Sequence, residues 1–420
     1  MPNKESTNLI FSHPTGNANS RAVLEGLCES SLLSEFHTCV ATYPGNTWSK
    51  LAHTPFGREF LRREFPETAR SRTRQRPSRE LVRMLANRAN LAFLTRQETG
   101  SFCVDAVYRD LDRTVARRIK RNHFRAVYAY EDGALESFRI AKERGVTCLY
   151  DLPIGYWRAA QRLLATERER WPEWAATMPG FRDSEAKLAR KDEELQLADN
   201  IYAASQFTRR TLEDFPGTLA NVEVIPYGFP SAGPPRDYVD LQSRKLKLLF
   251  VGGLSQRKGI ADVFAVADAL SDKVELTVVG RGAVQECPAL ESALNRHHWI
   301  PSLPHEQVLQ TMREHDVLLF PSLFEGFGLV ITEAMSQGTP VITTDRTAGP
   351  DVITHGEDGW IIPAGDTAAL QSAVENLLHA PDQLATVGEN ARQTAMQRPW
   401  SAYGNDVAAS VKQLFEATRA

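Results

Sequence analysis

Two glutamates mark the part of the chain whose residues are best suited to chemistry. Glu325 follows the apolar run 317–320, and Glu333 lies within a segment of helical spacing further on. Gly326 and Gly328 stand between them, and glycine lets a backbone turn sharply and approach a ligand. Strand ends in open α/β sheets are ligand sites, helix N-termini attract anions, and carboxylates accept strong hydrogen bonds from hydroxyls. This stretch therefore predicts a site for a molecule with phosphates and hydroxyls. The alternative is that both glutamates are solvated turn and helix residues.

A cationic loop follows another apolar run in the second half of the chain. Gly252 and Gly253 come directly after the run, and Arg257 and Lys258 stand just before the next helical segment. Glycines at a strand end with cations at a helix start favour phosphate binding. The loop lacks the Lys-Ser/Thr ending of a P-loop and the G-x-G-x-x-G dinucleotide pattern. The alternative is an exposed loop with two solvated cations. Arg281, after a further apolar run, is a weaker phosphate candidate.

The first half of the chain opens with a similar arrangement. The apolar run 9–11 precedes a polar loop that contains His13, Gly16 and Asn17, and a helical segment, 21–33, follows. Gly16 would let the backbone approach a ligand phosphate, whereas the alternative is an ordinary tight turn. His13 is a candidate polar contact at a strand end, although a lone histidine is more often structural.

Two further acidic residues follow apolar runs in the first half. Glu131 comes after the run 126–129, and Asp151 comes after the run 148–150. Because the carboxyl ends of parallel strands meet at one edge of a sheet, both side chains are expected where ligands bind. The alternative is that each residue is the N-cap of the following helix.

Short apolar runs alternate with helical segments through both halves of the chain, which predicts parallel sheets with helices on both faces. The expected fold class is therefore α/β. Residues 227–235 are rich in proline and glycine, so the domain boundary is placed there. One domain is expected at 1–232 and a second at 233–399. A final helix at 400–420 follows after the second fold should be complete.

The composition argues against several classes of protein. A chain of 420 residues with 42% hydrophobic and 24% charged residues fits a soluble protein with two domains. The net charge of −3 implies no nucleic-acid partner. The polar first residues do not form a signal-peptide core, and no apolar run is long enough to span a membrane. The five cysteines are scattered, without a C-x-x-C pair, so a reduced cytosol is the expected location.

One segment departs from this balanced charge. Residues 57–125 hold 18 Lys or Arg against 8 Asp or Glu, and residues 79–96 have helical spacing. The plain interpretation is a solvated helical face. The sharper one is a surface for anionic lipid at the cytoplasmic membrane face, or for an anionic acceptor such as a lipid-linked pyrophosphate. Nucleic acid is disfavoured because aromatic residues are sparse. Asp110 and Asp112 form a D-x-D triplet, which is interpreted as salt-bridged helix surface, so no metal site is predicted.

These motifs together resemble the retaining glycosyltransferases of family 4, which have the two-domain GT-B fold. Glu325 and Glu333 match the E-x7-E motif of that family, and residues 252–259 resemble its G-R-x-x-x-x-K-G diphosphate loop. Residues 198–208 look like the family's segment at the last strand of the first domain, and residues 221–228 look like its hinge motif. The resemblance covers both halves and is denser in the second. It implies two Rossmann-like domains that face a central cleft.

The resemblance implies a nucleotide-sugar donor in the second domain, with UDP- or GDP-sugars expected. Arg257 and Lys258 are expected to contact the diphosphate. Glu333 is expected on the ribose hydroxyls and Glu325 on the sugar side. Asp151 stands where many relatives carry a histidine, and it completes the set of catalytic candidates. The expected donor-binding residues are Gly252, Gly253, Arg281, Gly326, Phe327, Gly328, Leu329 and Glu333. The expected acceptor or cleft residues are His13, Gly16, Asn17 and Glu131.

The implied reaction transfers the sugar, with retention of anomeric configuration, to a hydroxyl of a glycan, a lipid-linked acceptor or a small molecule. No metal or other cofactor is expected, because the two loop cations stabilise the departing diphosphate. The helix 400–420 is expected to cross back onto the first domain. Two alternatives share the architecture: a sugar-nucleotide 2-epimerase, which needs no acceptor, and a non-catalytic nucleotide-sugar-binding protein. A phosphorylase would need a lysine for pyridoxal phosphate, and no convincing one is found.

Overall fold

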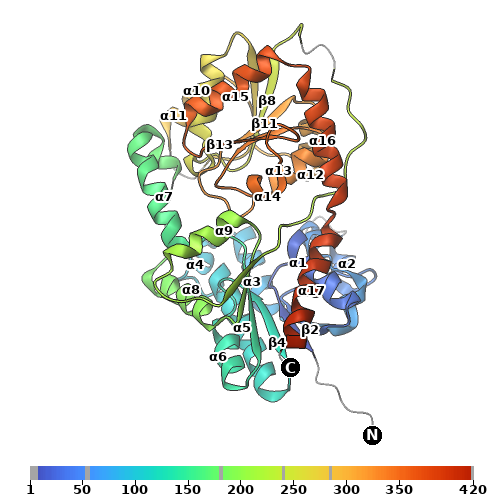
Figure 1. Cartoon of the computed structure of the whole chain (residues 1–420). Helices are drawn as coiled ribbons and strands as arrows, with labels where there is room; N and C mark the ends of the chain where they lie inside the picture. Colours follow the sequence, from blue (N-terminus) through green and yellow to red (C-terminus); the bar gives the residue numbers. More distant parts are fainter. Residues whose placement is uncertain (1–7, 53–56, 179–182, 239–241, 283–285, 418–420) are drawn as a thin grey trace.

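The computed structural model describes residues 8–52, 57–178, 183–238, 242–282 and 286–417. It contains two parallel β-sheets packed between helices, one from each half of the chain (Figure 1). The predicted α/β class with two parallel-sheet domains is confirmed. The exact boundary between residues 232 and 233 stays a prediction.

The first sheet positions the candidate residues of the N-terminal half. Its strands within the described residues are β1 (Leu9–Ser12), β2 (Leu33–Thr38), β3 (Thr73–Gln75), β4 (Ala126–Tyr130), β5 (Thr147–Leu152), β6 (Asn200–Ala203) and β7 (Asn221–Val224). They are parallel and run in the order β3-β2-β1-β4-β5-β6-β7. The order reverses between β1 and β4, and such a switch point leaves a crevice at the strand ends. The loop with Gly16 follows β1, and Glu131 follows β4.

The second sheet has the same design. Its strands, in the described part of the chain, are β8 (Leu246–Val251), β9 (Val274–Val279), β10 (His298–Ile300), β11 (Val317–Phe320), β12 (Val341–Thr344) and β13 (Trp360–Ile362). They are parallel, in the order β10-β9-β8-β11-β12-β13. Here the order reverses between β8 and β11, so the cationic loop and the glutamate turn leave the sheet side by side.

Helices connect the strands. In the first half they are α1 (Ala18–Glu29), α2 (Thr47–Ala52), α3 (Ser78–Arg88), α4 (Ala92–Thr95), α5 (Val104–Arg121), α6 (Leu135–Glu143), α7 (Trp157–Arg170), α8 (Glu185–Leu197) and α9 (Gln206–Thr211). In the second half they are α10 (Ile260–Ala269), α11 (Pro288–Leu294), α12 (His305–Arg313), α13 (Leu329–Ser336), α14 (Gly349–Val352), α15 (Thr367–His379), α16 (Gln383–Gln397) and α17 (Trp400–Ala417). Short 3₁₀ segments are η1 (Arg58–Arg63), η2 (Glu67–Arg72), η3 (Pro172–Thr177), η4 (Leu212–Asp214) and η5 (Gln256–Lys258).

The central strands are apolar because both of their faces are covered. Every residue of β11 is at most 1% exposed, as expected for a parallel strand between two helical layers. In Figure 1 the sheet of the second domain lies between α10 and α15 on one side and α12, α13 and α16 on the other. Such strands place their carboxyl ends rigidly, which makes them suitable supports for a binding site.

Two predicted helices have other bounds in the structure. The helix predicted at 21–33 is α1, which begins at Ala18 and ends at Glu29, because Ser31 adopts a left-handed φ of +55° and turns the chain into β2. The segment 79–96 forms α3 and the short α4, separated at Asn90, whose φ is +54°. Asparagine tolerates this conformation better than most residues. The prediction of a helix after the first loop was therefore right except for its bounds, and the prediction of one continuous helix over 79–96 was wrong.

The two aspartates of the D-x-D triplet lie in different environments. Asp110 forms ion pairs with Arg76 and Arg79, as predicted for a salt-bridged surface. Asp112 is instead 3% exposed and accepts hydrogen bonds from the backbone N–H groups of Glu136 and Ser137, at 2.7 and 2.9 Å. It caps the N-terminus of α6, so the surface interpretation was wrong for Asp112.

The final helix, α17, lies against α1 of the first half (Figure 1). The two helices touch through glycines: a Cβ on Gly26 would lie 2.2 Å from the carbonyl oxygen of Gly404. Ser410 Oγ also lies 3.0 Å from Tyr202 Oη. The chain passes from the first sheet to the second after β7 and returns before α17, and these two connections are joined where the Phe229 N–H donates to the Arg398 carbonyl at 2.8 Å. Across the described ranges, no helix has both the length and the apolarity that crossing a membrane requires.

Candidate active site

Two loops meet at the switch point of the second sheet. The loop after β8 ends in η5, and the turn after β11 leads into α13. Their backbones are joined, because the Leu323 N–H donates to the Arg257 carbonyl at 2.9 Å and Ser322 Oγ donates to the same carbonyl at 3.2 Å. The cations of one loop are therefore held in a fixed position relative to the carboxylate of the other.

Arg257, Lys258 and Glu325 converge at this junction. Arg257 Nη1 donates to the Phe324 carbonyl at 2.7 Å and lies 3.4 Å from Glu325 Oε2. Lys258 Nζ contacts the same carboxylate oxygen and lies 5.0 Å from the centre of the Phe320 ring. The Lys258 side chain is only 13% exposed and that of Glu325 16%. Two cations and one carboxylate thus share a site that is largely shielded from water.

Burial changes the acidity of these groups. Desolvation, with a smaller effect from the nearby Arg257 guanidinium, lowers the pKa of Lys258 to about 6, while contact with the Glu325 carboxylate favours its charged form. Desolvation also lowers the pKa of Arg257. Both cations would therefore be stabilised by an additional anion at this site, such as a diphosphate.

The glutamate turn depends on glycine geometry. Gly328 has φ +89°, and the first N–H groups of α13, which starts at the next residue, have no side-chain cap. Uncapped N–H groups at a helix start are suited to an anion, so the predicted phosphate contact there stays a prediction. Gly326 is packed so closely that a Cβ would lie 2.2 Å from the Pro153 carbonyl oxygen. Phe327 is 3% exposed, and the centre of its ring lies 4.8 Å from that of Tyr227. Leu329, in contrast, is 39% exposed.

Glu333 lies further along α13 and is partly buried. Its side chain is 22% exposed, and Oε1 lies 3.8 Å from His305 Nδ1 on α12. Burial raises its pKa, an effect that His305 opposes. An acceptor group in this position, about one helical turn from the first N–H groups of α13, suits a hydroxyl-bearing part of a ligand whose phosphate those groups would hold.

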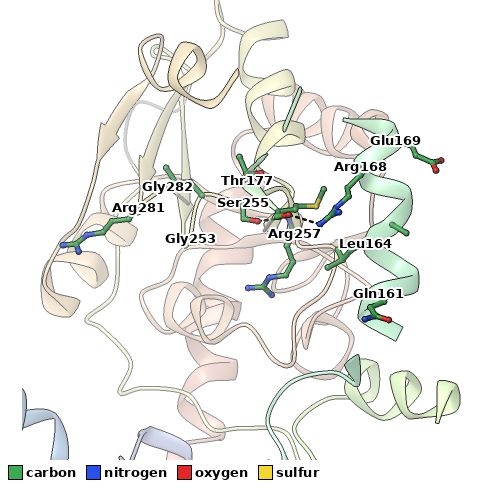
Figure 2. Close-up of a pocket in the computed structure, with 13 residues that line it drawn as sticks. Gln161, Leu164, Arg168, Glu169, Thr177, Gly253, Ser255, Arg257, Arg281 and Gly282 are labelled. Atoms are coloured by element: carbon green, nitrogen blue, oxygen red, sulfur yellow. Dashed lines mark hydrogen bonds between the residues drawn. The ribbon is translucent and has the colours of Figure 1, made fainter. Parts of the chain in front are cut away.

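Of the remaining second-domain candidates, Gly253 and Arg281 line a cavity of about 920 Å³ (Figure 2). Gly252 has φ +154°, and its N–H donates to the Val279 carbonyl at 3.0 Å. A Cβ on Gly253 would meet nothing within 4 Å, so the cavity is open there. Arg281 is exposed at its rim, with its guanidinium turned away from Gly253 in Figure 2.

The β1 loop candidates are engaged in local structure. His13 Nδ1 accepts hydrogen bonds from the N–H groups of Gly16 and Thr15, at 2.7 and 3.3 Å. Burial, and to a lesser degree Arg21, lowers the pKa of His13 to about 3, so the ring is neutral. The Asn17 side chain caps α1. Gly16 has φ +75°, and a Cβ there would lie 2.4 Å from the Phe65 ring.

The two acidic candidates of the first sheet lie below the surface. Asp151 is 2% exposed and accepts a hydrogen bond from Tyr128 Oη at 2.7 Å. Burial raises its pKa to about 7. Glu131 lies 3.4 Å from Lys191 Nζ on α8, and burial raises its pKa to about 7 as well. Glu131 is not the N-cap of α6, since Glu194 accepts from the N–H groups at the start of that helix. Asp151 is not the N-cap of α7, where Tyr156 holds that position. Their proposed roles as catalytic and cleft residues stay predictions.

A clamp on the glutamate turn was missed by the sequence reasoning. Ser205 Oγ and Thr208 Oγ1 both donate to the Gly326 carbonyl, at 2.6 and 2.9 Å. Ser205 is also the N-cap of α9. Its second bond joins residues that are far apart in the chain, and no local pattern signals such a contact. The first domain therefore holds the turn that carries Glu325.

Among the described residues, no group of three His, Cys, Asp or Glu side chains is placed to hold a metal ion.

Two facing parallel-sheet domains, with sites at their switch points, define the GT-B architecture. Sucrose-phosphate synthase from Thermosynechococcus elongatus aligns with 98% of this chain and 100% of its own, with a TM-score of 0.65 and 18% identity. HepE from Anabaena, in complex with UDP, aligns with 97% of this chain and 100% of its own, with a TM-score of 0.61 and 15% identity. The predicted GT-B fold is confirmed.

Sequence comparison assigns the second domain more closely. Residues 236–394 match the family model described as Glycosyl transferases group 1. Glycogen synthase from Mycobacterium tuberculosis (strain CDC 1551 / Oshkosh) is 27% identical over 253 residues, which cover 58% of this chain and 59% of that protein. Phosphatidyl-myo-inositol mannosyltransferase from Mycobacterium leprae (strain TN) is 36% identical over 140 residues, 31% of this chain and 37% of that protein. The matched part spans less than two thirds of each of these relatives. The second domain is a glycosyl transferases group 1 domain.

Proposed function

We propose that the protein is a retaining glycosyltransferase that moves a sugar from a UDP- or GDP-sugar to a hydroxyl of a glycan, lipid-linked or small-molecule acceptor, without a metal ion. The observation that carries this proposal is the convergence of Arg257, Lys258 and Glu325 at the switch point between β8 and β11. The group 1 match of the same domain supports it. HepE, whose fold is similar, was solved with UDP-glucose, which makes UDP-sugars the first donors to test.

In this mechanism the loop cations stabilise the departing nucleoside diphosphate. Arg257 and Lys258 face the leaving phosphates, together with the N–H groups at the start of α13. Because these groups are fixed and largely dry before the reaction, they need no reorganisation as negative charge develops. Glu333 holds the ribose hydroxyls and Glu325 the sugar side. The acceptor attacks on the face from which the diphosphate leaves, and a phosphate oxygen takes its proton, so the anomeric configuration is retained.

We further propose that α3 and α4 touch an anionic membrane surface. These helices expose large apolar side chains, with Leu85 67% and Phe93 65% exposed, among the arginines of the segment 57–125. Apolar side chains flanked by cations suit shallow insertion between anionic headgroups. Flotation with vesicles containing phosphatidylglycerol should carry the wild type and not a Leu85→Glu/Phe93→Glu variant. Equal flotation of both proteins would refute this contact.

A donor screen tests the proposed reaction. Thermal unfolding is followed with UDP-, GDP- and ADP-sugars, and a donor at 100 times its Kd should stabilise the fold by about 2.7 kcal/mol. The stabilising donor is then incubated with hydroxyl acceptors, and the anomeric proton of the product is read by NMR. Turnover that needs no acceptor and releases free nucleotide would favour the 2-epimerase. Binding without turnover of any acceptor would favour a nucleotide-sugar-binding protein, and no binding of any sugar nucleotide would refute the proposal.

A further inference from the structure

The cavity of about 920 Å³ has a wall that the donor contacts do not explain (Figure 2). On one side it is lined by the donor loops, through Gly253, Arg257 and Arg281. The opposite wall is α7 with the adjoining η3, a segment from the first half of the chain. In Figure 1, α7 extends from the first domain alongside the second. Neither Lys258 nor Glu333 lines the cavity, so it lies beside the proposed nucleotide site, with Arg257 between them.

Apolar packing fixes this wall to the second domain. Trp174 of η3 is 6% exposed and stacks on Phe264 of α10, with ring centres 5.7 Å apart and an interplanar angle of 21°. Trp174 belongs to the same hydrophobic core as β8 and β9. Cys287 Sγ also donates to the Glu173 carbonyl at 3.4 Å. Segment 172–177 is therefore part of the second domain's core, although it precedes β6 in the sequence.

A buried polar network joins the wall to the cationic loop itself. The Gln256 N–H donates to Thr177 Oγ1 at 2.9 Å, and Gln256 Nε2 donates to Glu167 Oε2 at 3.1 Å. Gln256 and Thr177 are 0% exposed and Glu167 is 5% exposed. Breaking such bonds would leave buried polar groups unpaired, which destabilises the packed arrangement. Both walls therefore belong to one rigid unit, and the cavity is preformed.

The chemistry of the lining favours an anionic ligand. Arg168 extends from α7 toward Ser255 of the loop after β8, and the Arg257 side chain lies below that loop in the view of Figure 2. Arg168 Nη2 donates to the Met178 carbonyl at 3.1 Å, which holds the guanidinium at the cavity, and this group has five N–H donors in all. Among the described residues that line the cavity, Glu169 is the acidic one, and it points away from the cavity in Figure 2. The other lining side chains are mainly apolar or neutral: Gln161, Leu164, Ala165, Thr177, Met178 and Leu254.

We propose that this cavity receives the acceptor, that the acceptor carries an oxyanion, and that Arg168 binds it. The inference rests on the proposed function, since only a transferase needs an acceptor next to the diphosphate. A volume of about 920 Å³ lies within the ordinary range for small-molecule sites and has room for a sugar unit with a charged group. Arginine pairs with phosphate and with carboxylate in the same bidentate way, so the two sources of the anion are separated by experiment.

The test measures anion binding to the protein saturated with UDP, which occupies the nucleotide site. Isothermal titration with inorganic pyrophosphate, and separately with malonate, compares phosphate with carboxylate. For whichever of the two anions the wild type binds more tightly, Arg168→Ala should lower the affinity about tenfold or more. Arg168→Lys should recover part of that affinity. Arg162→Ala is the matched control, because Arg162 lies on the same helix with its side chain 62% exposed and paired with Asp214, outside the cavity. This control should bind like the wild type.

Equal anion affinity of the wild type and Arg168→Ala would overturn the proposal, and so would an absence of anion binding to the wild type. UDP affinity, titrated in the same proteins, separates the two hypotheses. UDP should bind all variants alike if Arg168 acts only on the acceptor side. If UDP fails to bind the wild type, the donor assignment fails, whereas an Arg168-dependent anion site would still be detected.

Discussion

Replacing Lys258 with methionine tests the role of the cationic loop. Methionine keeps an unbranched side chain of similar length and removes the charge. The Lys258 side chain is 13% exposed and contacts Glu325, while Arg257 stays in place 3.4 Å from the same carboxylate. The substitution therefore removes one of two cations from a site whose walls are otherwise unchanged.

The degree of burial sets the expected size of the effect. Two unit charges 4 Å apart interact by about 1 kcal/mol in bulk water and about 4 kcal/mol in the partly shielded environment near a protein surface. The low exposure of Lys258 places it in the second regime. Removal of one preorganised group from such a site costs about 2.7–4 kcal/mol, or roughly 10²–10³ in kcat. If Lys258 were instead fully solvated, its removal would cost about 1 kcal/mol, which lowers kcat only about fivefold.

The stability of the variant separates catalysis from folding. Burial lowers the pKa of Lys258, so its charge costs the folded state free energy, which offsets the loss of its contact with Glu325. Because Arg257 stays 3.4 Å from that carboxylate, Lys258→Met should melt close to the wild-type temperature. The assay combines initial rates at saturating donor with thermal unfolding. Lys247→Met is the control, since Lys247 lies on β8, is 39% exposed and stands 4.0 Å from Glu275. A loss of less than fivefold in kcat, or a loss matched by a fall in Tm, would refute the role of Lys258.

Further predictions concern the other candidates. Glu333→Ala should raise the donor KM about tenfold or more with kcat nearly unchanged, because it removes ground-state binding; a fall in kcat at constant KM would contradict this. Activity should survive excess EDTA, and a loss that Mn²⁺ or Mg²⁺ restores would end the metal-free proposal. The pKa of Asp151 is raised from 3.8 to about 7, so its proton is bound more tightly in the folded protein and wild-type stability should fall as pH rises through that window. Denaturant unfolding should show Asp151→Asn gaining stability relative to the wild type from pH 4 to 7, by at most about 4 kcal/mol; parallel curves would exclude a buried carboxylate that titrates there.

The sequence by itself determined the class of fold and the two loops of the candidate site. Apolar runs such as 317–320 become buried strands because their composition suits a layer covered on both faces. Gly328 and the cations at the end of the β8 loop have local signatures, since a positive φ and a helix start depend on neighbouring residues. These features could be predicted because short stretches of chain specify them.

Tertiary structure alone decided which groups share a space and which are covered. Asp151 was expected after a strand that ends at residue 150, yet it lies within β5, and its carboxylate is buried against Tyr128. The His13 ring accepts hydrogen bonds from its own loop, and the α7 wall reaches the donor loop through Gln256. Burial and hydrogen bonding across long separations depend on how whole layers pack, and no periodicity within a segment encodes that packing.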